Sequence, residues 1–369
     1  MMPQNFPERT MTALRWWGPR DVRVDTIPVP ADPPDGWVLI EIEACGICGT
    51  DVEEYLNGPI VVPLTEHPLT GAKAPLTFGH EAVGTIRESR DPAAPPVGTR
   101  VVVEGNRFCG RCFWCRRGEY PLCAQVASLG QMDHGGLADF MIAPGFMCLP
   151  LDAELPPTEA VLVEPLSVGV RALSRQPELA GASVVIFGAG TVGLLAGQAA
   201  RAMGAADVIM VDANPAKREV SLACGASTFL TPDGLGVLPQ RYEAGGPDLA
   251  IECAGSTAAA RSAIEVIRRG GTAILLGVHD DTFEVPMLPF VLDEKTVTSS
   301  RSHAWDTDFP RALELLRSGA IVTAPLITRV IPLSRTVEDG FVPLSRPGHS
   351  EIKIVVVPDR LKPTDQTGG

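Results

Sequence analysis

The sequence has little positive charge. It contains five lysines, and its 31 basic residues are outnumbered by 44 acidic ones, which leaves a net charge of −13. A protein that binds the phosphate backbone of nucleic acid, or an anionic membrane surface, usually presents a broad basic face. The charge balance therefore argues against nucleic acid as a partner.

Long hydrophobic runs are also missing. No stretch approaches the roughly 18 apolar residues that mark a membrane span. The first ten residues carry Pro3, Glu8 and Arg9 in place of the apolar core of a signal peptide. We therefore expect no membrane association and a cytoplasmic protein.

Cysteine is comparatively frequent, with nine in the 369 residues. Without an export signal, such cysteines are more often reduced thiols or metal ligands than a disulfide framework. Four of them fall within residues 109–123, and Cys45 and Cys48 form a second, smaller group. The scattered Cys148, Cys224 and Cys253 are expected to be small core residues.

The length corresponds to two domains at roughly 150 residues each. Between residues 12 and 150, short apolar runs are broken by Gly and Pro, which is typical of a β-rich domain. Between residues 183 and 277, strand-like runs alternate with Ala-rich helical stretches, which indicates βαβ units and a parallel sheet. We predict an α/β protein in which a β-rich domain, residues 1–156 and 301–369, flanks a doubly wound domain, residues 157–300.

Individual elements can be placed within this outline. One helix is expected near residues 309–318 and a last strand at 352–357, and residues 363–369 look disordered. The candidate parallel strands are residues 184–187, 208–211, 249–252 and 273–276.

A glycine-rich turn follows the first of these strands. Residues 188–193 match G-x-G-x-x-G, and an Ala-rich helix begins directly after them. The glycines allow a tight turn and close approach of the backbone to a pyrophosphate, and the helix N-terminus supplies free N–H groups. The next strand ends at Asp212, where a carboxylate can accept hydrogen bonds from ribose hydroxyls. The candidate cofactor residues are Gly188, Gly190, Thr191, Val192, Gly193 and Asp212.

Asp212 also bears on the choice of cofactor. A carboxylate at this place repels a 2′-phosphate, and the next residue is Ala213 instead of an arginine. The sequence therefore predicts NAD in preference to NADP. We interpret Lys217 and Arg218, one helical turn further on, as a solvated face.

Cys109, Cys112, Cys115 and Cys123 supply four soft ligands in one short loop. Four thiolates complete a tetrahedral shell and leave no position for substrate, so the spacing favours a structural zinc. An iron–sulfur cluster, or four reduced thiols without a metal, would be the alternatives.

Three further segments carry a resemblance. Residues 43–51 include Cys48-Gly-Thr-Asp, residues 79–81 are Gly-His-Glu, and residues 164–166 are Glu-Pro-Leu. In this order the chain resembles the zinc-containing medium-chain alcohol and polyol dehydrogenases through nearly its whole length, and residues 54–60 and 67–71 look most like those of the 2,3-butanediol dehydrogenases. The resemblance implies a GroES-like catalytic domain, a Rossmann domain, and a homodimer or homotetramer.

The resemblance also implies a second, catalytic zinc. It assigns Cys48 and His80 as ligands, with Glu81 or Glu164 as the carboxylate ligand, and it leaves Cys45 outside the set. A Cys/His/Glu set keeps the open position that a catalytic zinc requires. Taken singly, each of these residues could instead be an ordinary core thiol, core histidine or helix-start carboxylate.

The implied reaction exchanges hydride between NAD and a secondary alcohol or its ketone. Catalytic zinc makes the hydroxyl group more acidic. By resemblance Thr50 passes the alcohol proton onward, and Asp51 orients a ligand. Many relatives have a histidine five residues after the zinc cysteine, where this chain has Glu53, and a carboxylate is a weaker base than imidazole near neutral pH. Glu53 is therefore either an unusual relay group or a surface carboxylate.

The substrate class is left open between a vicinal diol, a sugar polyol and a cyclitol. A different class of function is a zinc-independent or non-catalytic NAD-binding relative of the same fold. Relatives without zinc lose the cysteine ligand, the Gly-His-Glu segment and the four-cysteine loop, all of which this chain retains.

Overall fold

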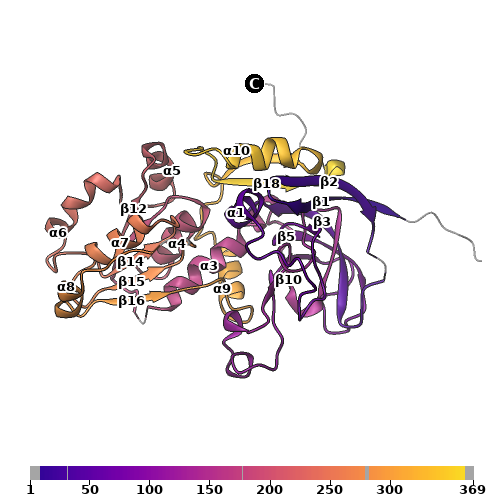
Figure 1. The fold of residues 1–369 in the computed structure, drawn as a ribbon, viewed down its shortest axis with the longest axis horizontal. Coiled ribbons are helices and arrows are strands. Elements are labelled where there is room, and N and C mark those ends of the chain that lie inside the picture. The colour runs from indigo at the N-terminus through magenta and orange to yellow at the C-terminus, as the bar shows by residue number, and fades with distance from the viewer. Residues whose placement is uncertain (1–8, 31, 177, 279–281, 362–369) are drawn as a thin grey trace, which may run out of the picture. The chain divides into compact units, whose positions relative to one another are not determined.

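The structure is a computed structural model that describes residues 9–30, 32–176, 178–278 and 282–361. The chain divides into two compact units (Figure 1). The first unit is Met1–Glu164 with Ile327–Gly369, and the second is Pro165–Leu326. Residues 363–369, expected to be disordered, lie outside the described residues.

The first unit is built mainly from antiparallel strands, with one parallel pair, β17 and β18, around a large core and a smaller cluster of Met11, Ala13 and Ala138. A three-stranded sheet has the order β2-β1-β4, and the main sheet runs β10-β6-β5-β3-β18-β17, with β9 paired to β3. Alternate side chains of β3 and β5 are buried against a core that includes Trp16, Phe78 and Phe341. The strands are β1 Thr10–Gly18, β2 Asp21–Pro28, β3 Trp37–Gly46, β4 Leu76–Thr77, β5 Glu81–Ser89, β6 Arg100–Val103, β7 Asn106–Arg107, β8 Ala127–Ser128, β9 Phe140–Pro144, β10 Cys148–Pro150, β17 Ile327–Pro332 and β18 Lys353–Val357.

Helices in the first unit are short. The longest that lies wholly within it is α1, Gly49–Asn57, which begins directly after β3. The others are α2 Pro157–Ala160, α10 Val342–Leu344, a π-helical turn at Thr336–Phe341, and 3-10 turns at Cys115–Arg117, Tyr120–Leu122, Gly145–Met147, Leu333–Arg335 and Asp359–Leu361.

The second unit holds a parallel sheet in the order β13-β12-β11-β14-β15-β16. Every residue of β11 is buried, which is expected of a central parallel strand covered on both faces. Helix α4 contacts β11 and β12, and α7 contacts β14 and β15 (Figure 1). The strands are β11 Ser183–Phe187, β12 Asp207–Val211, β13 Thr228–Leu230, β14 Leu249–Glu252, β15 Thr272–Leu275 and β16 Thr296–Ser299, and the helices are α3 Val163–Ser174, α4 Thr191–Ala202, α5 Arg218–Ala223, α6 Leu238–Arg241, α7 Thr257–Val266, α8 Met287–Leu292 and α9 Asp308–Arg317, with 3-10 turns at Pro215–Lys217 and Pro232–Val237.

This strand order is that of a doubly wound dinucleotide-binding fold, so the predicted fold class is confirmed. The four predicted parallel strands are present within one residue, and the predicted helix and last strand begin within one residue of α9 and β18. Strands β13 and β16 were not predicted: β13 is only three residues long, and β16 is short and mostly polar.

The division between the units differs from the predicted domain boundaries. The structure assigns residues 157–164 to the first unit and 301–326 to the second. An ion pair at 3.1 Å joins Arg171 of α3 to Asp308 of α9. The Gln198 side chain of α4 pairs with the backbone of Val322 through both its amide atoms. These contacts hold α9 and the segment after it on the parallel sheet.

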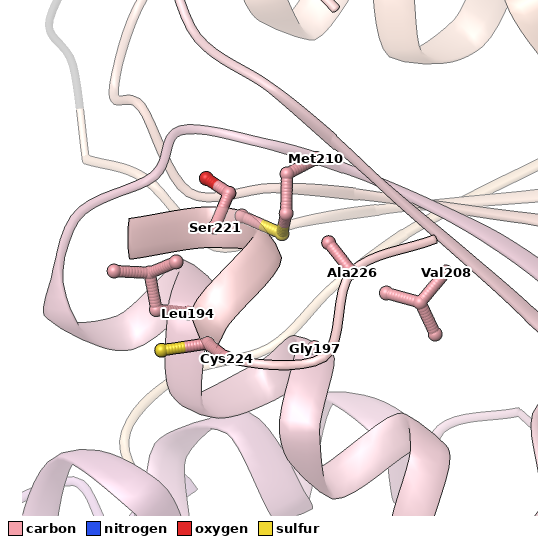
Figure 2. A pocket seen from close by; sticks show the side chains of 7 residues that line it. All are labelled: Leu194, Gly197, Val208, Met210, Ser221, Cys224 and Ala226. Atoms are coloured by element: carbon pink, nitrogen blue, oxygen red, sulfur yellow. The ribbon is translucent and has the colours of Figure 1, made fainter. Parts of the chain in front are cut away.

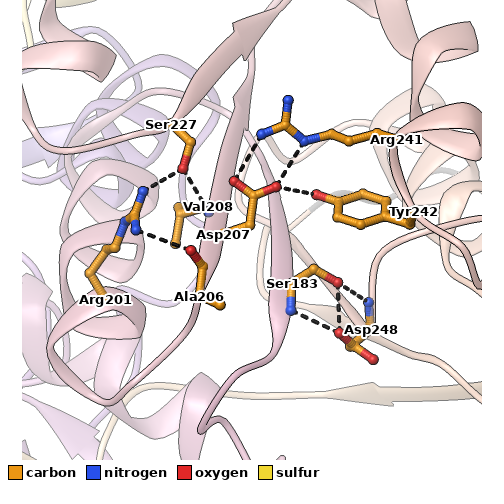
Figure 3. Close-up of polar contacts among 9 residues, drawn as sticks. All are labelled: Ser183, Arg201, Ala206, Asp207, Val208, Ser227, Arg241, Tyr242 and Asp248. Atoms are coloured by element: carbon orange, nitrogen blue, oxygen red, sulfur yellow. Dashed lines mark hydrogen bonds and ion pairs between the residues drawn. The ribbon is translucent and has the colours of Figure 1, made fainter.

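Polar contacts close the amino ends of the parallel strands (Figure 3). Asp207, at the start of β12, accepts hydrogen bonds from Arg241 and from the Tyr242 hydroxyl at 2.7 Å. Although burial opposes the shift, these bonds lower the pKa of Asp207 to about 2. Ser183 and Asp248 pair in the same way at the starts of β11 and β14. The opposite, carboxyl edge of the sheet is where ligands bind in this fold.

A small crevice lies between α4, β12 and α5 (Figure 2). It has no room for a water molecule, so it is a packing defect and not a ligand site. Its lining residues are Leu194, Gly197, Val208, Met210, Ser221, Cys224 and Ala226.

Within the part of the chain that the structure describes, no helix has both the length and the apolar character needed to cross a bilayer.

Candidate active site and metal centres

Cys48 lies at the start of α1, where the chain leaves β3. Its backbone N–H donates to Asp51 Oδ2 at 3.0 Å, which caps the first turn of the helix. The same carboxylate reaches His80, with Asp51 Oδ1 3.5 Å from His80 Nδ1. Asp51 thus ties the cysteine segment to the histidine segment, as expected of a group that orients a metal ligand.

His80 and Glu81 lie between β4 and the start of β5. Gly79, just before them, has a φ of +97°, and a Cβ there would be 2.7 Å from Cys45 Sγ. Glycine is therefore required for the tight approach of this turn to β3. Burial lowers the pKa of His80, but the Asp51 carboxylate and the Cys48 sulfur outweigh it and raise the pKa well above its usual value.

Glu81 forms a buried ion pair with Lys353 of β18. Lys353 Nζ lies 2.7 Å from each carboxylate oxygen and also donates to the carbonyl of Ile47 at 2.8 Å. Glu81 is fully buried and Lys353 is 2% exposed. A Cβ at Gly46 would come 1.8 Å from Glu81 Oε2, so only glycine leaves room for the carboxylate.

These donors are grouped closely enough for a metal ion. One ligand atom each of Cys48, His80 and Glu81 lies within 4.8 Å of the others. Sulfur, imidazole nitrogen and carboxylate oxygen are the three zinc ligand types, so the donor set fits zinc. Glu164, at the start of α3, is also buried. Burial raises the pKa of Glu81, the positive charge of Lys353 lowers it, and the negative charge of Glu164 raises it again, with a net raised pKa. Glu164 therefore lies near the group without belonging to it.

Thr50 and Glu53 lie on the exposed side of α1. The Thr50 hydroxyl accepts a hydrogen bond from Gln131 Nε2 at 2.9 Å. Glu53 accepts one from Asn57 Nδ2 at 2.8 Å, one helical turn further on. The structure gives Glu53 no bond to Thr50, and a bond to a solvent-facing partner favours the surface interpretation.

The four-cysteine loop also forms a metal-sized group, with its sulfur atoms within 4.8 Å of one another. The backbone N–H groups of Cys109 and Gln125 point at Cys123 Sγ, at 3.3 and 3.4 Å. Backbone hydrogen bonds lower the pKa of Cys112 to about 6, whereas burial raises that of Cys115 to about 12. All four sulfurs can be thiolates together near neutral pH only if a cation neutralises them, so the loop fits a metal ion.

The glycine-rich turn has the geometry of a nucleotide loop. Gly188 has a φ of +99°, and a Cβ at Gly193 would lie 1.9 Å from the Gly188 carbonyl oxygen. Gly190 caps α4, so Thr191 and Val192 form its first turn with their N–H groups at the loop. Asp212 accepts hydrogen bonds from Ala189 N at 2.7 Å and Asn214 N at 2.8 Å, which fixes the carboxylate beside the glycines.

Comparison with known proteins agrees with both units. Residues 34–153 match the alcohol dehydrogenase GroES-like domain, and residues 191–318 match the zinc-binding dehydrogenase family. The chain is 32% identical to an (R,R)-butanediol dehydrogenase of Bacillus subtilis, over 95% of this chain and all of that protein. The chain belongs to the zinc-binding alcohol dehydrogenase family.

Further matches include another relative and two solved structures. A sorbitol dehydrogenase of Bacillus subtilis is 32% identical over 97% of this chain and 99% of its own length. The crystal structure of the 2R,3R-butanediol dehydrogenase of Bacillus subtilis superposes with a TM-score of 0.87, at 31% identity over 95% of this chain and all of that chain. A protein of Sinorhizobium meliloti 1021, solved with NADP, superposes with a TM-score of 0.85 at 28% identity over 95% of this chain and all of that chain.

The family membership confirms the predicted resemblance and the prediction that the protein is an alcohol dehydrogenase. It does not favour the zinc-independent alternative. The sequence analysis missed two residues that this family member places at its candidate site. Lys353 lies 272 positions after Glu81 and Gln131 lies 81 positions after Thr50, so no local spacing connects them. A lone lysine inside an apolar strand was the one available signal.

Proposed function

We propose that this dehydrogenase uses a catalytic zinc, a structural zinc and NAD to interconvert a secondary alcohol and its ketone, with a diol, polyol or cyclitol as substrate. The observation that carries the proposal is the group of Cys48, His80 and Glu81, in which His80 and Glu81 are buried and Cys48 is half-buried, with Asp51 beside it. Names of relatives, which include butanediol, sorbitol and D-xylulose enzymes, support the substrate class.

Glu81 is the third zinc ligand in this proposal. It belongs to the donor group, whereas Glu164 lies outside it. The Lys353 ammonium holds the Glu81 carboxylate in place, and each carboxylate oxygen retains a lone pair for a metal. Glu164 is buried and its charge acts on Glu81, so it is the residue that would take turns with water as a further ligand.

The chain's own groups then account for the proton. Zinc, when bound, supplies the Lewis acidity that makes the substrate hydroxyl easier to deprotonate. The Thr50 hydroxyl accepts that proton and passes its own toward solvent. For Glu53 to act as the outer acceptor, its carboxylate would have to leave Asn57, which donates to it at 2.8 Å. The carbinol carbon loses hydride, for which the nicotinamide ring is the acceptor.

NAD is proposed in preference to NADP. The Asp212 carboxylate is anchored where it would meet the ribose hydroxyls, and it would repel a phosphate there. Lys217 is buried, so its expected place on a solvated face was wrong and it does not present a charge to a phosphate. Arg218 is exposed, as expected, and its Nη1 donates to the Phe229 carbonyl at 3.4 Å.

A homo-oligomer is proposed through the edge strand β16 and helix α8. Among the described residues β16 pairs on one side only, with β15. Leu288 and Leu292 of α8 are 72% and 71% exposed, which is an unusual apolar surface for a monomer. A second copy that adds its own edge strand would cover both features. A monomer in light scattering at micromolar concentration would contradict this.

A cytoplasmic location is proposed from the cysteines. All nine are free thiols, and six of them lie in or beside the candidate metal groups. Recovery of the protein in an extracellular fraction with oxidised cysteines would contradict this.

The test of the proposed function is a panel of secondary alcohols with NAD, combined with elemental analysis. Two zinc per chain and NADH formation with at least one diol, polyol or cyclitol are expected. Full zinc content with no turnover of any member, in either direction, would refute the proposed reaction.

A further inference from the structure

Gln131 is a buried amide whose side chain points at the candidate site. It is 8% exposed, and its Nε2 donates to Thr50 Oγ1 at 2.9 Å. Thr50 itself is exposed and lies two residues after Cys48. The buried amide of Gln131 therefore contacts an exposed hydroxyl beside the group of Cys48, His80 and Glu81, where a substrate would bind.

The loop that carries Gln131 is held rigidly. Gly130 N donates to the Asp133 carbonyl at 2.9 Å, and Met132 N donates to the Ser128 carbonyl at 2.8 Å. The Thr70 hydroxyl donates to the Met132 carbonyl at 2.8 Å. A loop tied on both sides of Gln131 fixes the amide before any substrate binds, so its direction is set by the fold.

The same loop is tied to the histidine segment. Gly136 N donates to the carbonyl of Gly79 at 2.8 Å, directly before His80. Leu129 N donates to the carbonyl of Gly105 at 2.8 Å, and a Cβ at Gly105 would meet the His80 backbone at 3.4 Å. Gln131 is therefore positioned relative to His80 as well as to Thr50.

The bond from Gln131 limits what Thr50 can do. A hydroxyl has one proton to donate and two lone pairs to accept with. Gln131 occupies one lone pair, which leaves one for a substrate hydroxyl and the proton free to leave in another direction. Among the described residues, this bond is the one that sets the direction of the Thr50 hydroxyl at the start of α1.

The other half of the amide is an acceptor without a partner. Among the described residues Gln131 Oε1 makes no hydrogen bond, and it is not sealed from solvent. It lies on the same amide as the group that contacts Thr50. A substrate whose first hydroxyl meets Thr50 can therefore give the hydrogen bond of a neighbouring hydroxyl to Oε1.

We infer that Gln131 is a positioning residue for Thr50 and the residue that selects a vicinal diol over a monohydric secondary alcohol. The inference rests on the proposed function and deepens it. Its donor side orients the Thr50 hydroxyl for either substrate, and its acceptor side recognises the second hydroxyl of the diol. The donor side can be removed by itself, or together with the acceptor side.

The experiment compares (R,R)-2,3-butanediol with 2-butanol in the zinc-loaded enzyme. Gln131→Met removes both sides, and we expect kcat/KM for the diol to fall about tenfold more than for 2-butanol. Gln131→Glu keeps an acceptor and removes the donor, so kcat is expected to fall for both alcohols while their kcat/KM ratio stays within about twofold. Gln198→Met is the matched control, because Gln198 is equally buried and pairs with the backbone of Val322.

A binding measurement separates recognition from turnover. In the NADH-bound protein no oxidation can occur, and calorimetry should show a roughly tenfold weaker diol complex for Gln131→Met and an unchanged 2-butanol complex. A parent enzyme that turns over no alcohol of the panel overturns the proposed function and this role together, whereas a parent that oxidises 2-butanol or a polyol but not the diol overturns this role alone. An active parent whose diol preference and diol affinity survive Gln131→Met overturns the role of Gln131 alone.

Discussion

The four-cysteine loop collects its donors from residues 109–123, whereas Cys48, His80 and Glu81 come from separate segments that β3, β5 and α1 bring together. The loop is partly exposed, with Cys109 and Cys112 reached by solvent. His80 and Glu81 are buried, and Lys353 and Asp51 hold them. A site made by local spacing depends on its metal to keep its shape, and a site assembled by packing keeps its shape without one.

The largest expected effect separates the two candidate metal sites. Cys48→Ser should lower turnover about a thousandfold or more, because the Lewis acid is lost, and should leave the fold nearly as stable as before. Cys109→Ser should lower the free energy of unfolding by roughly 2–5 kcal/mol, because the loop loses the ion that neutralises its thiolates. For each variant, kinetic assays measure turnover, chemical denaturation measures the free energy of unfolding, and elemental analysis measures zinc content.

Cys224→Ser is the control for thiol loss, since Cys224 lies in neither donor group. A Cys109→Ser protein with two zinc ions and parent stability would remove the contrast between the sites.

The next effect concerns the buried pair that holds Glu81. Lys353→Met should destabilise the fold by about 3–5 kcal/mol, because it leaves a buried carboxylate without its partner. Lys353→Met combined with Glu81→Gln should recover part of that loss, since the charge disappears. Unfolding midpoints of both variants test this. Equal stability of the two would show that the pair does not hold the assembled site.

A third effect concerns the nucleotide loop, which like the four-cysteine loop is a local motif. Asp212→Ala should lower the NAD over NADP preference about tenfold, because ribose loses an acceptor and phosphate repulsion disappears. Steady-state kinetics with both cofactors measure it. Glu219→Ala, a nearby exposed carboxylate, should leave the preference unchanged. An unaltered ratio in Asp212→Ala would remove Asp212 as the selector.

A smaller effect is expected at Glu53. If Glu53 accepts the proton from Thr50, the Glu53→Gln variant should oxidise the alcohol about two- to fivefold more slowly near neutral pH. The difference in rate should shrink at alkaline pH, because hydroxide can then take the proton. The pH–rate profile is the measurement, with Glu88→Gln as an exposed control. Superimposable profiles for Glu53→Gln and the parent would make Glu53 a surface residue that hydrogen-bonds Asn57 and nothing more.

The smallest effect is expected away from both candidate metal sites. Gly197→Ala, inside α4, places a Cβ at 3.4–3.5 Å from Ile186, Met210 and Val208, which is ordinary contact, beside the crevice of Figure 2. Helix propensity and packing should together raise stability by about 1 kcal/mol. Thermal unfolding tests this, and zinc content should not change. A lower melting temperature would show that the space is tighter than the contacts indicate.

Much of the second unit was predictable, because a buried parallel strand is a continuous apolar run and a nucleotide turn is a local glycine pattern. The short strands β13 and β16 were missed because β13 has only two apolar residues, Phe229 and Leu230, and β16 has one, Val297, which is too few for such a run. The boundary at residue 326 was missed because it depends on contacts between residues more than 120 positions apart. Arg171 pairs with α9, and Gln198 pairs with the segment that follows α9.

By itself the sequence determined the donor types, the order of the motifs, the parallel strands and the glycine turn, since each is a matter of residue type and short spacing. Only the tertiary structure decided that Glu81 is held by Lys353, that Asp51 reaches His80, and that Gln131 meets Thr50. Such pairs depend on register between strands and loops far apart in the chain, and a single sequence carries no local signal for register.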